Sequence, residues 1–190
     1  TLERAAAMIQ GQPDEPEPGL IPNAQGVVID TLQQNVFYHL ALARHLQGDF
    51  DGAVDAWREC MERSNNPDSL SSGTNWLCAS LLRAGRTAEA DDALRAIRAD
   101  LPIVEYHAYF ALCRVYRGEL DGDRVLADAA AKGPASTDYA TVAYGVGNWH
   151  FVHGRVDRAY EVWAEAARAP MWAAFGRIAS EAEIARRGSR

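Results

Sequence analysis

The chain has 190 residues, of which 48% are apolar and 24% are charged, so it is long enough for one domain or one compact array with a buried core. Its 19 basic and 26 acidic residues leave a net charge of −7, which argues against a nucleic-acid partner because such affinity comes mostly from basic residues. No apolar run approaches the length of a membrane span, so we expect no membrane insertion.

The first thirty residues combine a helical segment with a proline-rich segment. Residues 1–10 have apolar positions at helical spacing and start at Thr1 rather than at a methionine. We therefore expect the tail of a truncated N-terminal repeat helix, with upstream sequence missing. Residues 11–30 contain four prolines interleaved with Asp14, Glu15 and Glu17. This composition cannot pack a core, and it predicts an extended acidic connector or an insert that lies over the array.

A short motif recurs from Gly48 onward. The stretches that begin at Gly48 and Gly154 share a glycine, a polar residue, an apolar residue, two polar residues, an alanine and, four residues later, a tryptophan. Gly85 begins a third copy with leucine in place of the tryptophan, and Gly118 begins a fourth in which Asp123 replaces the alanine. The glycines are 37, 33 and 36 residues apart. This spacing is close to the period of about 34 residues of tetratricopeptide repeats, and the chain resembles that family.

The resemblance implies an all-α fold, an α-solenoid of helix-turn-helix repeats that forms a right-handed superhelix. Each repeat glycine follows a helical segment, at a turn where the residue must accept a positive φ. We expect the motif alanine to lie where paired helices cross closely, and the bulky residue one turn later to fill the space between pairs. These positions are Ala53 with Trp57, Ala90 with Leu94, and Ala159 with Trp163.

Prolines mark the boundaries between the predicted repeats. Breaks are expected at residues 65–68, 100–102, 132–134 and 169–170, because proline lacks an amide donor and disfavours helix in the residue before it. They give four repeats over residues 31–170 and a capping helix over residues 171–190, with Trp172 on its buried stripe. Ser69, Ser71 and Ser72 precede a helix and are expected to cap it together with Asn75.

The function that the resemblance implies is a non-enzymatic protein–protein interaction module. The front helices of such an array line a concave groove, where tyrosine and asparagine side chains can stack on and hydrogen-bond to an extended segment of a protein or peptide. The alternative for several of these side chains is packing against the connector or a neighbouring repeat. The predicted groove residues are Asn35, Tyr38, Leu42, His45, Asn75, Arg83, Glu105, Tyr144, Asn148 and Phe151.

Two other functions stay open as alternatives. One is a regulatory or sensor domain within a larger protein, and the other is a small-ligand or enzymatic pocket near residues 144–150. Gly145 and Gly147 fit close helix packing better than a phosphate-binding loop. His150 and His153 lack a third ligand, and no catalytic motif occurs, so we expect no enzyme, metal or cofactor. The single lysine, Lys132, argues against a carboxylate clamp for chaperone C-termini.

The three cysteines favour a reducing compartment. Cys60, Cys78 and Cys113 lie among apolar residues of helix-like segments, without the spacing of a metal site or a disulfide framework. We expect buried thiols and, from them, a cytoplasmic location. The exposed ends of a solenoid also predict a possible homo-oligomer.

Overall fold

The computed structural model describes residues 1–188, so Ser189 and Arg190, the last two residues of the predicted cap, lie outside the described residues. Within this range the protein is all-helical, with ten α-helices and no β-strand, which confirms the predicted all-α class. The helices form two compact units, one from Thr1 to Phe110 and one that begins at Ala111. The repeat pattern does not predict this division.

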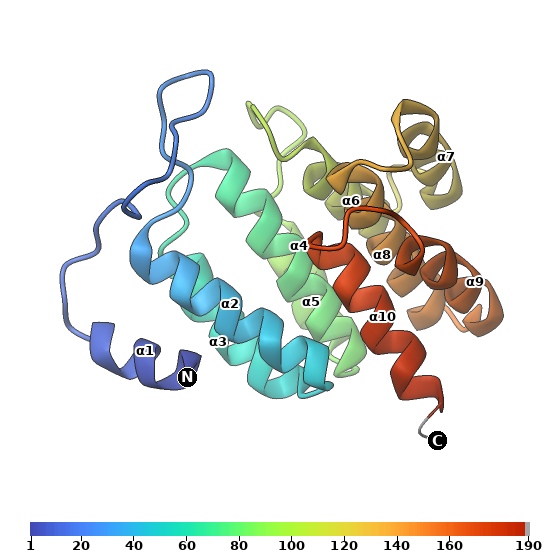
Figure 1. Ribbon diagram of the computed structural model, residues 1–190, viewed down its shortest axis with the longest axis horizontal. Helices are drawn as coiled ribbons and strands as arrows, with labels where there is room; N and C mark the ends of the chain where they lie inside the picture. The colour runs from blue at the N-terminus through green and yellow to red at the C-terminus, as the bar shows by residue number, and fades with distance from the viewer. Residues whose placement is uncertain (189–190) are drawn as a thin grey trace. The chain divides into compact units, whose positions relative to one another are not determined.

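The first unit is a row of helices in which each one packs against its neighbours along the chain (Figure 1). Helices α2 and α3 form one hairpin, and α4 and α5 form the next. The connector between α1 and α2 leaves the helices as an irregular loop and returns to the start of α2 (Figure 1). The helices are α1 (Leu2–Ile9), α2 (Leu32–Gln47), α3 (Phe50–Glu62), α4 (Pro67–Arg83) and α5 (Thr87–Leu94).

The second unit is built around one central helix. Helix α8 packs against α7, α9 and α10, and all its residues from 139 to 148 are buried. Helix α6 (His107–Tyr116) begins in the first unit and ends in the second. The other helices are α7 (Gly122–Lys132), α8 (Thr137–Val152), α9 (Val156–Ala167) and α10 (Phe175–Gly188).

The four repeat glycines occupy turns that require their conformational freedom. Gly48, Gly85, Gly118 and Gly154 all have φ between 73° and 83°, a region that side chains with a Cβ avoid. At the end of α2, the N–H of Gly48 donates to the carbonyl of His45 at 3.0 Å. This bond satisfies one of the carbonyls that a helix end leaves open. The predicted turn role of the glycines is confirmed at all four positions.

The repeat alanines lie in the interior, as predicted for positions of close packing. Ala53, Ala90 and Ala159 have no exposed surface, and neither have Trp57 and Trp163. The indole Nε1 of Trp163 donates to the carbonyl of Tyr144 on α8 at 3.2 Å. The Nε1 of Trp57 has no hydrogen-bond partner among the described residues. The two tryptophans therefore occupy the same position of the repeat, but only the indole N–H of Trp163 is hydrogen-bonded.

All four predicted breaks separate helices, but the last helix starts later than predicted. Pro67 is the first residue of α4. A backbone N–H at this position makes no hydrogen bond within the helix, so proline costs the helix nothing there. Helix α10 starts at Phe175 instead of residue 171, and Trp172 is 76% exposed. The prediction that Trp172 lies on a buried stripe is wrong, because turns from Pro170 to Trp172 and from Met171 to Ala174 hold this segment outside the helix.

The capping prediction for α4 also needs correction. Its N-cap is Asn66, whose Oδ1 accepts from the N–H of Ser69 at 2.9 Å. The hydroxyls of Ser71 and Ser72 donate to carbonyls one turn earlier, within the helix. The serines are therefore interior residues of a helix that begins before them.

One buried carboxylate fixes the approach to α6. Asp68, in the first turn of α4, is 2% exposed. Its Oδ1 accepts from the N–H groups of Glu105 at 2.9 Å and Tyr106 at 2.7 Å, and the N–H of Val104 lies 3.3 Å away. Because three amide donors converge on this carboxylate, it holds the irregular segment before α6 in place.

Candidate functional site

Half of the predicted groove residues are interior side chains. Leu42, His45, Asn75, Tyr144 and Asn148 are at most 4% exposed. The Nδ1 of His45 lies 2.8 Å from the hydroxyl of Ser80, and the side-chain amide of Asn148 donates to the hydroxyl of Tyr116 at 3.0 Å. Because these five side chains pack inside their units, they do not form the accessible surface that was predicted for them.

The other five predicted residues are at least partly exposed, and they are divided between the two units. Arg83 lies at the end of α4 that is far from Asp68, with its guanidinium 4.6 Å from the ring centroid of Phe50. Phe151 belongs to the second unit, where its ring contacts Trp163. Besides Arg83, the predicted residues in the first unit are Asn35, Tyr38 and Glu105.

Two carboxylates and three tyrosines gather beside α2, and we call them the acid–tyrosine cluster: Glu17, Asp30, Tyr38, Tyr106 and Tyr109. The hydroxyls of Tyr38 and Tyr109 lie 3.5 Å apart, and the rings of Tyr106 and Tyr109 meet edge to face at 5.7 Å. The hydroxyl of Tyr106 lies near the carboxylate of Asp30, whose pKa it lowers. Glu17 reaches the cluster from the connector, where it accepts from the side-chain amide of Asn35.

Burial shifts the pKa of three members of this cluster. It raises the pKa of Asp30, which the neighbouring Glu17 carboxylate raises further and His39 lowers. Burial likewise raises the pKa of Tyr38 well above its usual range, with the hydroxyl of Tyr109 as the next cause. The pKa of Tyr106 is raised by burial and then by Asp30. The phenols of Tyr38 and Tyr106 therefore stay protonated, while the ionised form of Asp30 is disfavoured in the folded protein.

The Asp30→Asn variant is expected to be more stable than the wild type at about pH 8, and this advantage should shrink toward about pH 4. The folded pKa of Asp30 is raised, so its stabilising contribution is complete below the unfolded pKa and is lost as pH rises through the folded pKa. Urea unfolding at both pH values measures the difference. Asp55→Asn, at an exposed position of α3, controls for the loss of one charge, and a difference that grew on acidification would contradict the assignment.

Sequence reasoning missed four members of the cluster. Glu17 and Asp30 lie in the connector, which was not expected to pack. Tyr106 and Tyr109 lie beside the predicted residue Glu105, and their spacing of three residues places both on one side of the helix start. That spacing was the signal that could have found them.

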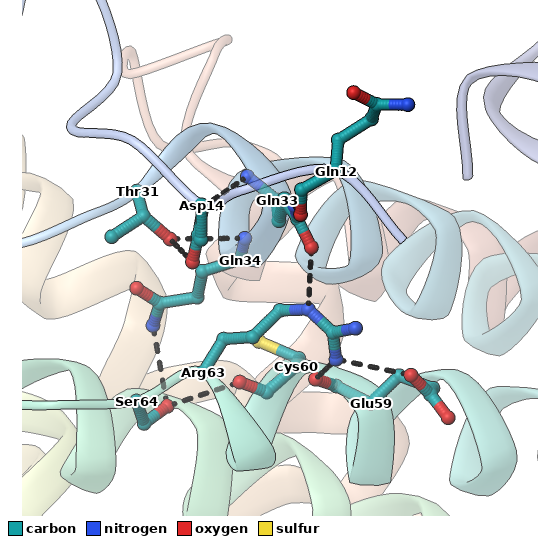
Figure 2. A network of polar contacts seen from close by, with 9 residues as sticks. All are labelled: Gln12, Asp14, Thr31, Gln33, Gln34, Glu59, Cys60, Arg63 and Ser64. Carbon is teal, nitrogen blue, oxygen red and sulfur yellow. Dashed lines mark hydrogen bonds and ion pairs between the residues drawn. The ribbon is translucent and has the colours of Figure 1, made fainter. Parts of the chain in front are cut away.

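The connector is bound to α2 by its acidic part, residues 14–17, which we call the acidic strap, and Figure 2 shows the contacts of Asp14. The N–H of Leu32 donates to the carbonyl of Glu15 at 2.8 Å, and Pro16 pairs with Thr31 in an isolated antiparallel bridge. The carboxylate of Asp14 accepts from the hydroxyl of Thr31 at 2.7 Å and from the N–H of Gln33 at 3.1 Å. The predicted alternative, in which groove residues contact the connector, is thus realised at Asn35.

A second set of contacts ties the residues before the strap to α3 (Figure 2). The side-chain amide of Gln33 donates to the carbonyl of Gln12 at 2.6 Å. Its oxygen accepts from Nε of Arg63 at 3.1 Å. Arg63 also donates to Glu59 at the end of α3 and lies 4.5 Å above the ring of Phe37. Gln33 therefore links the connector to the first hairpin.

The polar network of the second unit is satisfied internally. The Nδ1 of His150 accepts from Nε of Arg155 at 2.8 Å, so its Nε2 carries the proton that faces Asp123 at 3.3 Å. Burial lowers the pKa of His150, which favours this neutral form. Asp123, which replaces the motif alanine, is also bonded by Arg158 at 3.1 Å. Both imidazole nitrogens are engaged, so this arrangement leaves neither one to act as a base or a ligand.

Close packing fills the region of the alternative pocket. A Cβ at Gly145 would meet the side chain of Leu112, and one at Gly147 would meet the indole of Trp163. This confirms that the two glycines serve helix packing. Among residues 1–188, no group of three or more His, Cys, Asp or Glu side chains could hold a metal ion. Within the same range, no helix has both the length and the apolar character needed to cross a membrane.

The cysteines are buried thiols, as predicted. Cys60, Cys78 and Cys113 lie in the interior. Burial is the main cause that raises the pKa of Cys60, to about 12, and it also raises the pKa of Cys113. The thiolate, which is the reactive form, is therefore disfavoured at these two positions.

Neither the models of known protein families, nor curated proteins, nor solved structures gave a match to this chain.

Proposed function

We propose that the first unit is a non-enzymatic interaction module that binds an extended segment of another protein, in the manner of a tetratricopeptide-like array. The binding surface is formed by Asn35, Tyr38, Tyr106 and Tyr109, which we call the tyrosine surface. The observation that carries the proposal is that these partly exposed aromatic and amide groups come together from α2 and the start of α6, far apart in the chain. Tyrosine offers a large contact area and a hydroxyl, and it is enriched where proteins bind one another.

The proposal predicts that extended peptides selected from a random library on the full chain bind through the tyrosines. We expect Tyr106→Ala combined with Tyr109→Ala to weaken their binding at least tenfold, because contact tyrosines commonly dominate affinity. Tyr38→Phe, which keeps the ring that packs against Trp57, tests the hydroxyl alone. Fluorescence anisotropy with labelled peptides measures the affinity.

The matched control is Trp172→Ala, which removes an aromatic side chain that is 76% exposed and lies in the second unit. It should leave the affinity unchanged. Unaltered affinity in a tyrosine variant that melts like the wild type would reject the tyrosine surface, as would a library from which no peptide is enriched.

A further inference from the structure

The acidic strap is held against α2 as an extended segment rather than as part of a helical hairpin. Its backbone pairs at both ends: the N–H of Leu32 donates to the carbonyl of Glu15 at 2.8 Å, and the N–H of Glu17 donates to the carbonyl of Asp30 at 3.4 Å. These bonds involve main-chain atoms, so any extended segment with a free carbonyl and amide at the same positions can form them.

Two side chains of the strap are recognised individually. Asp14 accepts from Thr31 and from the N–H of Gln33, in the first turn of α2, where the helix dipole favours an anion. Glu17 accepts from the side-chain amide of Asn35, one turn further along α2. The start of α2 therefore binds the carboxylates of Asp14 and Glu17, which are three residues apart in the chain with Pro16 between them.

The strap adds no apolar core to the unit. Asp14, Glu15 and Pro16 are exposed, and the flanking Gly11 and Gly19 have φ of 76° and 87° with open space around them. Glu17 and Asp30 also repel each other, which is one cause of the raised pKa of Asp30. The strap is thus held by a few polar contacts and is flanked by two glycines that pack against nothing, so a similar segment can take its place.

We propose that the partner of the first unit carries an extended acidic segment and binds by displacing the acidic strap. The segment has the same pattern as the strap: an acidic residue, any residue, proline and then glutamate. This rests on the proposed function, because Asn35 belongs to both the strap contacts and the tyrosine surface. The strap is a resident competitor in the same chain. Its effective concentration is on the order of millimolar, so the partner must bind more tightly than the strap or the strap must first be released.

The test uses a labelled peptide that copies residues 10–20 and two full-length proteins, the wild type and Asp14→Ala combined with Glu17→Ala. These substitutions loosen the strap but leave its acceptor surface intact. We expect the variant to bind the peptide at least tenfold more tightly than the wild type. A peptide with Asn and Gln in place of the two recognised acids should bind at least tenfold more weakly, and Asn35→Ala in the loosened variant should lower the affinity.

Equal affinity of the two proteins, equal affinity for the neutral peptide, or tighter binding of a peptide with lysine at the two acidic positions would each overturn the proposal. If the double variant does not fold, Glu17→Gln alone loosens the strap while keeping the contacts of Asp14. Library peptides that depend on Tyr106 and Tyr109 but share no acidic pattern would reject this inference and leave the proposed function standing. Failure of every peptide would reject both.

Discussion

Replacing Gly176 with alanine is expected to destabilise the second unit by about 3 kcal/mol or more. Gly176 is buried at the start of α10, and a Cβ there would meet the backbone of α8, at 2.5 Å from the carbonyl carbon of Ala140 and 2.8 Å from Cα of Thr141. Backbone cannot move aside as a flexible side chain can, so the two helices must separate. Hydrogen exchange of peptides from α8 and α10 measures the loss within this unit.

The control for this substitution is in the same helix. Gly188 ends α10 and has no atom within 4 Å of an added Cβ. Gly188→Ala is therefore expected to leave exchange protection unchanged or slightly increased, because alanine favours helix over glycine. Wild-type protection in Gly176→Ala would show that α8 and α10 do not approach as closely as described.

The second large effect is expected at the two repeat tryptophans. Both Trp57→Ala and Trp163→Ala empty a fully buried site and should each destabilise their unit by about 3–5 kcal/mol. The phenylalanine variants should differ from one another. Trp163→Phe loses a hydrogen bond to Tyr144, whereas Trp57→Phe removes an N–H that has no partner, so we expect Trp163→Phe to cost about 1 kcal/mol more.

Hydrogen exchange measures the loss of protection in α3 for the Trp57 variants and in α9 for the Trp163 variants. The alanine variants set the scale for the whole side chain, and the phenylalanine variants isolate the indole nitrogen together with the change in ring size. An equal loss of protection in Trp57→Phe and Trp163→Phe would mean that the bond to Tyr144 contributes nothing to stability.

Features that depend on local backbone geometry could be predicted from the sequence. Gly48 and its three counterparts must take positive φ wherever the helix turns, so their spacing revealed the hairpins. Ala53 and Ala159 followed from the same frame, because only a small residue fits a close crossing. The start of α10 did not follow, since an apolar residue such as Trp172 suits a helix stripe and an exposed turn equally well in a single sequence.

The candidate site was predicted only where its residues lie on a regular helix. Asn35 and Tyr38 share one face of α2, and helical spacing identified them. Glu17 and Asp30 depend on the return of the connector to α2, and composition cannot predict a fold that rests on a few polar bonds. Asn75 and Asn148 were expected in the groove because helical spacing placed them on the groove-facing stripe of the front helices, but the structure buries both.

The single carboxylate that holds the approach to α6 determines where this chain tolerates changes in length. Asp100 lies in an exposed turn and pairs with Arg98. Residues inserted beside it would therefore leave the hydrogen bonds from the backbone amides to Asp68 unchanged. A deletion between residues 103 and 106 would instead rotate the N–H groups of Glu105 and Tyr106 away from that carboxylate. Insertions and deletions among natural versions of this sequence should therefore occur before residue 103 and be absent between residues 103 and 106.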